Sequence, residues 1–128
     1  MPSSFARATP AMLALLKALY DAGVTIIPGT DSFAGYGLHH ELELYARAGI
    51  APAEVLRLAT LTSAHVIGVD GERGVLAPGK LADLILVEGD PSVHIEDIER
   101  VSLVMRGGRI YDPVRIEQAL GIAPRAGS

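Results

Sequence analysis

Asp31 is the residue whose position most clearly predicts chemistry. It follows the run Val-Thr-Ile-Ile-Pro-Gly-Thr at residues 24–30, where β-branched apolar residues stop at a proline and a glycine. Such a run is typical of a buried strand, and the acid after it would lie at the strand's C-terminal rim, where parallel α/β folds carry their active sites. A carboxylate there could bind a divalent metal and accept a proton from its water, although an aspartate after Gly-Thr could also only form a turn.

A second polar cluster, His-His-Glu-Leu-Glu, occupies residues 39–43. On a helix His39 and Glu43 would share a face, as would His40 and Glu43. The spacing could hold a metal, but it is not the His-Glu-x-x-His pattern of zinc proteases. A polar first turn of a surface helix explains His40 and Glu43 equally well. His39 and Glu41 directly follow the loop that carries the aspartate and could reach the same pocket.

The remaining candidates favour structure over chemistry. His65 lies in a mostly apolar segment, and His94 lies among polar loop residues. Asp83 interrupts a strand pattern, which indicates an inward polar contact or a sheet edge. The glycines do not form a phosphate-binding pattern, and no serine has the setting of a nucleophile elbow.

Composition excludes several classes of function. The net charge is −4 without a basic cluster and aromatic content is 5%, so no nucleic-acid partner is expected. There are no cysteines, which leaves His, Asp and Glu as metal ligands. The apolar runs are too short to cross a membrane and the first residues do not form a secretory signal, so a cytoplasmic location is expected. A hydrophobic fraction of 49% and a mean hydropathy of +0.33 indicate apolar surface that something else covers.

The first half of the chain predicts helices around one strand. Thr9 as N-cap and Pro10 at the first position open a helix that ends at Gly23. The strand at residues 24–27 follows, buried on both faces as in a parallel sheet. Three further helices are expected: residues 39–48 ending at Gly49, one with Pro52 at its first position, and residues 64–67, capped by Thr62-Ser63 and ended by Gly68.

The second half predicts a small antiparallel β unit. We expect an extended piece at residues 74–76, a strand at 82–87, and a hairpin of 101–106 and 109–111 around Gly107-Gly108. A helical turn is expected at residues 116–120 and a frayed end at 123–128. These strands are too few to be stable alone and need a partner sheet. The expected division is residues 1–70, residues 71–118 and a tail of 119–128.

Together these stretches resemble the C-terminal portion of metal-dependent amidohydrolases, in particular the imidazolonepropionase and Xaa-Pro dipeptidase-like branch. The resemblance rests on GVTIIPGTDS at 23–32, LHHELEL at 38–44, GIAPAEVL at 49–56, GVLAPGKLADLILV at 74–87 and VSLVMRGGRIY at 101–111. The PGKLADL stretch followed by the GGRIY hairpin is its most specific part.

The resemblance implies an α/β fold: the last βα units of a TIM-like (β/α)8 barrel plus the C-terminal strands of a small β-sandwich. Residues 24–27 would be the last barrel strand. Asp31 would match the metal-binding aspartate that accepts a proton from the attacking water, and His39 would match the histidine near the substrate. The substrate class would be a small amide or peptide, and the cofactor zinc or a similar divalent ion.

The chain also departs from this family pattern. A barrel needs about 250 residues, and the 128 residues contain no His-x-His pair. Zinc needs three or four ligands, and only Asp31 carries over. We therefore expect a C-terminal segment of an enzyme that hydrolyses C–N bonds, incomplete, inactive and without bound zinc when alone. A homo-oligomer or a complex with a complementing N-terminal chain is expected. The alternative is a non-catalytic module that docks a partner chain; whether the segment is a fragment, a split-gene product or a relic stays open.

Overall fold

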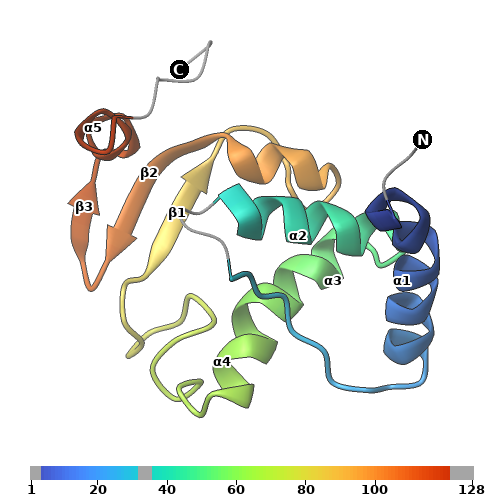
Figure 1. Ribbon diagram of the computed structural model, residues 1–128. Helices are drawn as coiled ribbons and strands as arrows, with labels where there is room; N and C mark the ends of the chain where they lie inside the picture. Colours follow the sequence, from blue (N-terminus) through green and yellow to red (C-terminus); the bar gives the residue numbers. More distant parts are fainter. Residues whose placement is uncertain (1–3, 32–35, 122–128) are drawn as a thin grey trace.

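A computed structural model of the chain describes residues 4–31 and 36–121. Helices α1 to α4 lie on one side and a three-stranded sheet lies on the other (Figure 1), so the fold is α/β. The elements are α1 (Ser4–Asp21), α2 (Tyr36–Arg47), α3 (Pro52–Arg57), the π-helical η1 (Leu58–Thr62), α4 (Ser63–Val66), β1 (Leu84–Val87), the 3-10 helix η2 (Ile95–Glu99), β2 (Val101–Arg106), β3 (Arg109–Tyr111) and α5 (Pro113–Ala119).

Helix α1 begins earlier than the sequence predicted. It starts at Ser4 and runs through Pro10, so the expected start at Thr9 is wrong. The stretch Ala-Arg-Ala before Thr9 has high helix propensity, and the helix therefore continues across the proline despite the hydrogen bond that the ring nitrogen cannot donate. Helix α2 likewise begins at Tyr36, one turn before the predicted residue 39.

The predicted glycine ends of the helices are confirmed. At the end of α2, Gly49 has a φ of 100° and its N–H donates to the carbonyl of Ala46 at 2.9 Å. The N–H of Ile50 donates to the carbonyl of Tyr45 at 3.3 Å, which completes a Schellman motif. This reversal places Ile50 in the core, where it is 2% exposed. Helices α1 and α4 end in the same way at Gly23 and Gly68.

The strand expected at residues 24–27 does not form. Residues 24–31 have no regular structure, and Val24 and Ile27 are 47% and 36% exposed instead of buried on both faces. A parallel strand needs neighbouring strands to bond its N–H and C=O groups. The described residues offer only the antiparallel sheet β1-β2-β3, so this segment has no strand beside it.

Helix α3, η1 and α4 form one continuous helical stretch. Pro52 stands at its first turn after Ala51, as predicted. The predicted cap at Thr62-Ser63 is wrong, because the Ser63 hydroxyl donates backward to the carbonyl of Leu58 at 2.7 Å. Hydroxyl groups that bond back to the preceding turn continue a helix and do not cap a new one.

The sheet confirms the antiparallel hairpin. Strand β2 pairs with β1 on one side and β3 on the other, and Gly107-Gly108 forms the turn. Strand β1 starts at Leu84, two residues later than expected, because Ala82 and Asp83 contact the hairpin turn. The Ala82 carbonyl accepts the N–H of Gly108 at 3.1 Å, and the Asp83 carboxylate accepts that of Gly107 at 2.7 Å. Asp83 thus makes a polar contact at the start of an edge strand. Residues 74–76 do not form the expected extended piece: residues 74 and 75 lie in a bend.

Two elements near the C-terminus differ from expectation. The helix η2 was not predicted at all. Helix α5 begins at Pro113, three residues before the expected turn, because the Asp112 carboxylate accepts the N–H of Val114 at 2.9 Å and caps the helix. The frayed end predicted at residues 123–128 lies outside the described residues.

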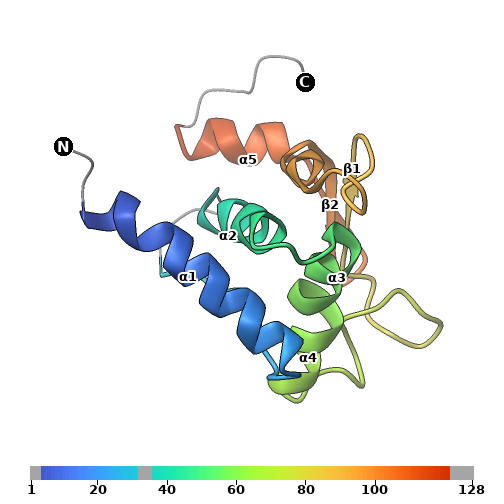
Figure 2. The same cartoon turned by 90° about the vertical axis from the view of Figure 1, so that its right-hand side faces the viewer.

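One apolar core joins the helical half to the β half. Helix α2 lies between α1 and α3 (Figure 2) and also contacts η2, while Val87 of β1 packs against the same core. The buried residues are Leu42, Tyr45, Ile50, Val55, Leu58, Ile95 and Ile98. The division of the chain at residues 70 and 118 stays a prediction.

A buried carboxylate holds η2 to the turn that follows β1. Asp97 is 8% exposed, accepts the backbone N–H of Asp90 at 2.9 Å and pairs with Arg100. The Asp90 hydrogen bond and then Arg100 hold the pKa of the Asp97 carboxyl below its usual value. Gly89 has a φ of 104°, and a Cβ there would overlap the Asp97 carboxylate. The turn and η2 therefore fit together only with glycine at this position.

We predict that Gly89→Ala destabilises the fold more than Gly108→Ala. Both glycines have positive φ, 104° and 78°, but a Cβ at Gly108 meets nothing within 4 Å. The overlap with Asp97 should cost about 1–3 kcal/mol beyond the shared backbone strain. Urea unfolding of the two variants measures the difference, and equal losses would contradict the Asp97 contact.

Candidate functional site

Asp31 stands at the exposed end of the irregular segment 24–31. The segment follows the end of α1 and runs beneath α2 in the view of Figure 1. Two contacts attach it to the core: Ile26 packs against the buried cluster, and the hydroxyl of Tyr45 donates to the carbonyl of Ile27 at 3.0 Å. Asp31 is therefore exposed to solvent, at the end of a segment that Tyr45 of α2 binds at Ile27.

His39 lies one turn into α2, half-buried, with its Nδ1 atom enclosed by the protein. Residues 32–35, which connect the two candidates in the sequence, lie outside the described residues. The step from Asp31 to Tyr36 covers five residues and spans at most about 18 Å. Both predicted site residues thus belong to the same junction between the segment 24–31 and α2.

The other acids and histidines of this region divide into two kinds. His40 and Glu43 pair on α2 with 3.5 Å between Nδ1 and Oε2. Because α2 begins at Tyr36, they lie beyond the first turn in which the sequence analysis placed them. Glu41 is half-buried. Burial raises the pKa of the Glu41 carboxyl, and the neighbouring His40 offsets part of that rise. A partly buried carboxylate with a raised pKa, close to this junction in the chain, is a candidate functional group.

The described residues do not fit a complete metal site by themselves. Within residues 4–31 and 36–121, no group of three or more His, Asp or Glu could hold a metal ion. His65 pairs with Asp70 at 2.8 Å and His94 faces Glu96 at 3.9 Å, all on the surface. Because zinc takes three or four ligands, the segment can offer at most part of a coordination sphere.

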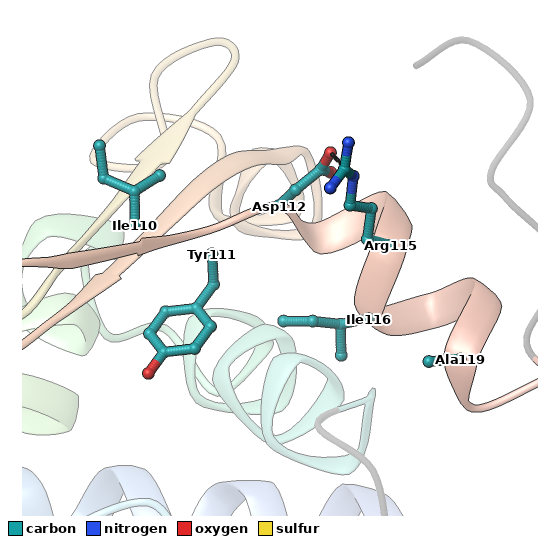
Figure 3. A pocket seen from close by; sticks show the side chains of 6 residues that line it. All are labelled: Ile110, Tyr111, Asp112, Arg115, Ile116 and Ala119. Atoms are coloured by element: carbon teal, nitrogen blue, oxygen red, sulfur yellow. Dashed lines mark ion pairs between the residues drawn. The ribbon is translucent and has the colours of Figure 1, made fainter.

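A hollow of about 420 Å³ lies between β3 and α5 (Figure 3). It is lined by Ile110, Tyr111, Asp112, Arg115, Ile116 and Ala119, and the Asp112–Arg115 ion pair stands at its edge at 3.6 Å. None of the residues predicted for chemistry lines it.

In the part of the chain that the structure describes, no helix has the length and apolar character to span a membrane.

A model of the amidohydrolase family matches residues 1–111. The chain belongs to the amidohydrolase family. The imidazolonepropionase of Rubrobacter xylanophilus is 31% identical over 101 residues, which cover 72% of this chain and 24% of that protein. Adenine deaminase 1 of Latilactobacillus sakei is 40% identical over 83 residues, which cover 65% of this chain and 13% of that protein.

Solved structures agree with this assignment. A Xaa-Pro dipeptidase with methionine in its active site matches 80% of this chain and 26% of its own length, with a TM-score of 0.74 and 30% identity. A prolidase-like structure from Bifidobacterium longum matches 86% of this chain and 30% of its own, with a TM-score of 0.71 and 32% identity. The resemblance to the imidazolonepropionase and Xaa-Pro dipeptidase branch is thus confirmed. The chain spans between 13% and 30% of the length of these relatives.

Tyr45 was missed as a candidate by the sequence reasoning. Its 6% exposure and the hydrogen bond to Ile27 show that it connects α2 to the segment that ends in Asp31. A signal was present, because a tyrosine on the apolar face of a helix needs a partner for its hydroxyl. The sequence alone does not say which backbone group 18 positions away supplies it.

Glu41→Gln should stabilise the chain at neutral pH. Well below its ordinary pKa of 4.5, the Glu41 carboxyl is neutral in both the folded and the unfolded state and does not affect stability. As the pH rises through the raised pKa of the folded state, the buried carboxylate becomes charged and the fold loses stability. Melting temperatures should therefore show a gain at pH 7 that disappears near pH 4. Glu43→Gln, which removes the partner of His40, is the matched control without such a gain. An equal effect of Glu41→Gln at both pH values would show that desolvation of this carboxylate is not the cause.

Proposed function

We propose that this segment supplies the catalytic aspartate of a metal-dependent amidohydrolase that hydrolyses C–N bonds in amides, cyclic amides or dipeptides. The observation that carries the proposal is the family match over residues 1–111, which includes the run 24–30 and the aspartate directly after it. Relatives described as imidazolonepropionase, adenine deaminase and Xaa-Pro dipeptidase support a substrate with a C–N bond to be cleaved.

The segment would act as the last part of a larger fold. Residues 1–70 are the last βα units of a (β/α)8 barrel, and residues 71–118 supply strands of a small β-sandwich. A complete barrel needs about 250 residues, so residues outside this sequence provide the other strands. Val24 and Ile27 are 47% and 36% exposed, and neighbouring strands would cover them and bond the backbone between them.

In the complete enzyme Asp31 would act as general base and then general acid. Its carboxylate takes a proton from the water that attacks the carbonyl carbon and returns it to the nitrogen that leaves. Such proton transfer contributes typically 10²–10⁴-fold to a rate. His39, at the same junction, would contact the substrate. Zinc or a similar divalent ion is expected only where residues outside the segment complete its coordination, since the described residues do not.

We predict that Asp31→Asn lowers kcat by about 10²–10⁴-fold in the complete enzyme, because the amide cannot take the proton. The assay measures release of the amine or ammonia from a panel of cyclic amides, adenine and Xaa-Pro dipeptides. Asp21→Asn is the matched control, since Asp21 is an exposed residue of α1 that pairs with Lys17. Unchanged turnover with Asp31→Asn would reduce this aspartate to a turn former.

The second candidate function is a non-catalytic module that docks a partner chain, and one sheet face favours it. The register Leu84↔Met105↔Ile110 and Leu86↔Leu103 gives one face five apolar side chains. Leu86 and Ile110 on that face are 53% and 65% exposed. An uncharged face of this kind needs a covering sheet, from the rest of the same enzyme or from another chain.

For the chain alone we expect association and not a well-behaved monomer. Light scattering after size exclusion at micromolar concentration measures the mass. Replacing Leu86 and Ile110 together by lysine should shift the mass toward that of one chain. Val93→Lys, at a position 60% exposed outside the sheet, should not. A compact wild-type monomer that unfolds cooperatively would contradict both the barrel-segment and the docking proposals.

A further inference from the structure

The segment 24–31 is attached to the helical core at a point four residues before Asp31. Tyr45 is almost fully buried, at 6% exposure, and its hydroxyl donates to the carbonyl of Ile27 at 3.0 Å. The ring belongs to the cluster that includes Leu42 of the same helix and the η2 residues Ile95 and Ile98. The position of the donor is therefore fixed by packing from several elements.

The tyrosine stays a donor over the working range of pH. Burial, and then the nearby carboxylate of Glu41, raise the pKa of the Tyr45 hydroxyl above its ordinary value of 10.0. The phenol is accordingly neutral and protonated wherever the protein is folded near neutrality. The hydrogen bond to the Ile27 carbonyl has an ordinary length of 3.0 Å. Its importance is that it fixes the chain four residues before Asp31.

The chain between the anchor and the acid is short and partly stiff. Pro28 follows the anchored residue, its ring fixes φ, and it also restricts the backbone of Ile27 before it. Only Gly29 and Thr30 separate the proline from Asp31. The carbonyl of Ile27 and the carboxylate of Asp31 are therefore joined by a short stretch of chain, in which the proline is the restricted residue.

We propose that Tyr45 is a positioning residue that sets the place of the Asp31 carboxylate through the carbonyl of Ile27. The inference rests on the proposed function, because it needs Asp31 to carry chemistry. Misplacement of a reacting group by roughly 1 Å can cost about 10²-fold in rate. Loss of the hydroxyl should therefore act on turnover, not on substrate affinity.

The test is Tyr45→Phe in the complete enzyme, which removes the hydroxyl and keeps the ring in the core. We expect kcat to fall about 10–100-fold with KM within about threefold of wild type. Tyr20→Phe is the matched control: Tyr20 is a partly buried residue of α1 that packs against the same core. It should keep the wild-type kcat. Activity is expressed per folded molecule, measured by circular dichroism.

Hydrogen–deuterium exchange of residues 24–31 distinguishes positioning of this segment from a general loss of stability, which would speed exchange throughout the helices. Tyr45→Phe should speed exchange in this segment and leave that of α3 and α4 unchanged. Wild-type kcat, or a low kcat with unchanged exchange in 24–31, overturns the inference. Asp31→Asn measured in parallel separates the two proposals: if it is fully active, the proposed function fails, whereas a dead Asp31→Asn beside a fully active Tyr45→Phe defeats only the role of Tyr45.

Discussion

The packing of η2 against α2 is the interaction on which the rest of this structure depends. Ile95 and Ile98 enter the same cluster as Leu42 and Tyr45, and so join the β half of the chain to its helical half. Asp97, between the two isoleucines, binds the turn after β1 and fixes η2 against the sheet. If this contact were lost, α2 would lose the support that holds Tyr45 against the segment 24–31.

A second constraint is that two apolar parts of the chain, residues 24–27 and one face of the sheet, are only partly covered by other described residues. Residues 24–27 have the composition of a buried strand, but the described residues place no strand beside them. The sheet has an apolar face on which Leu86 and Ile110 are largely exposed. Both features have the same physical origin, since backbone groups and apolar side chains of this kind are stable only when paired and covered. They agree with a chain that covers only part of the relatives it matches, 24% in the case of the imidazolonepropionase.

Local signals in the sequence predicted local structure well. Glycine in the left-handed region ends α2 at Gly49, and the Gly107-Gly108 hairpin forms as expected, because both depend on neighbouring residues. The strand at 24–27 was predicted wrongly because its apolar pattern is that of a strand buried between neighbouring strands, and the described residues contain no such neighbours. Helix η2 and the role of Tyr45 depend on contacts between distant parts of the chain, which no local pattern contains. Asp31 and His39 came from position and resemblance, and their roles remain predictions.

A metal position measured in the complete enzyme tests most directly whether this segment carries the catalytic aspartate. Anomalous diffraction at the absorption edge of the bound metal locates the ion independently of any assumed ligand. The proposal predicts an anomalous peak about 2.0–2.2 Å from a carboxylate oxygen of Asp31, with the remaining ligands from outside residues 1–128. A fully occupied metal whose coordination is complete without Asp31, with that carboxylate turned to solvent, would contradict it.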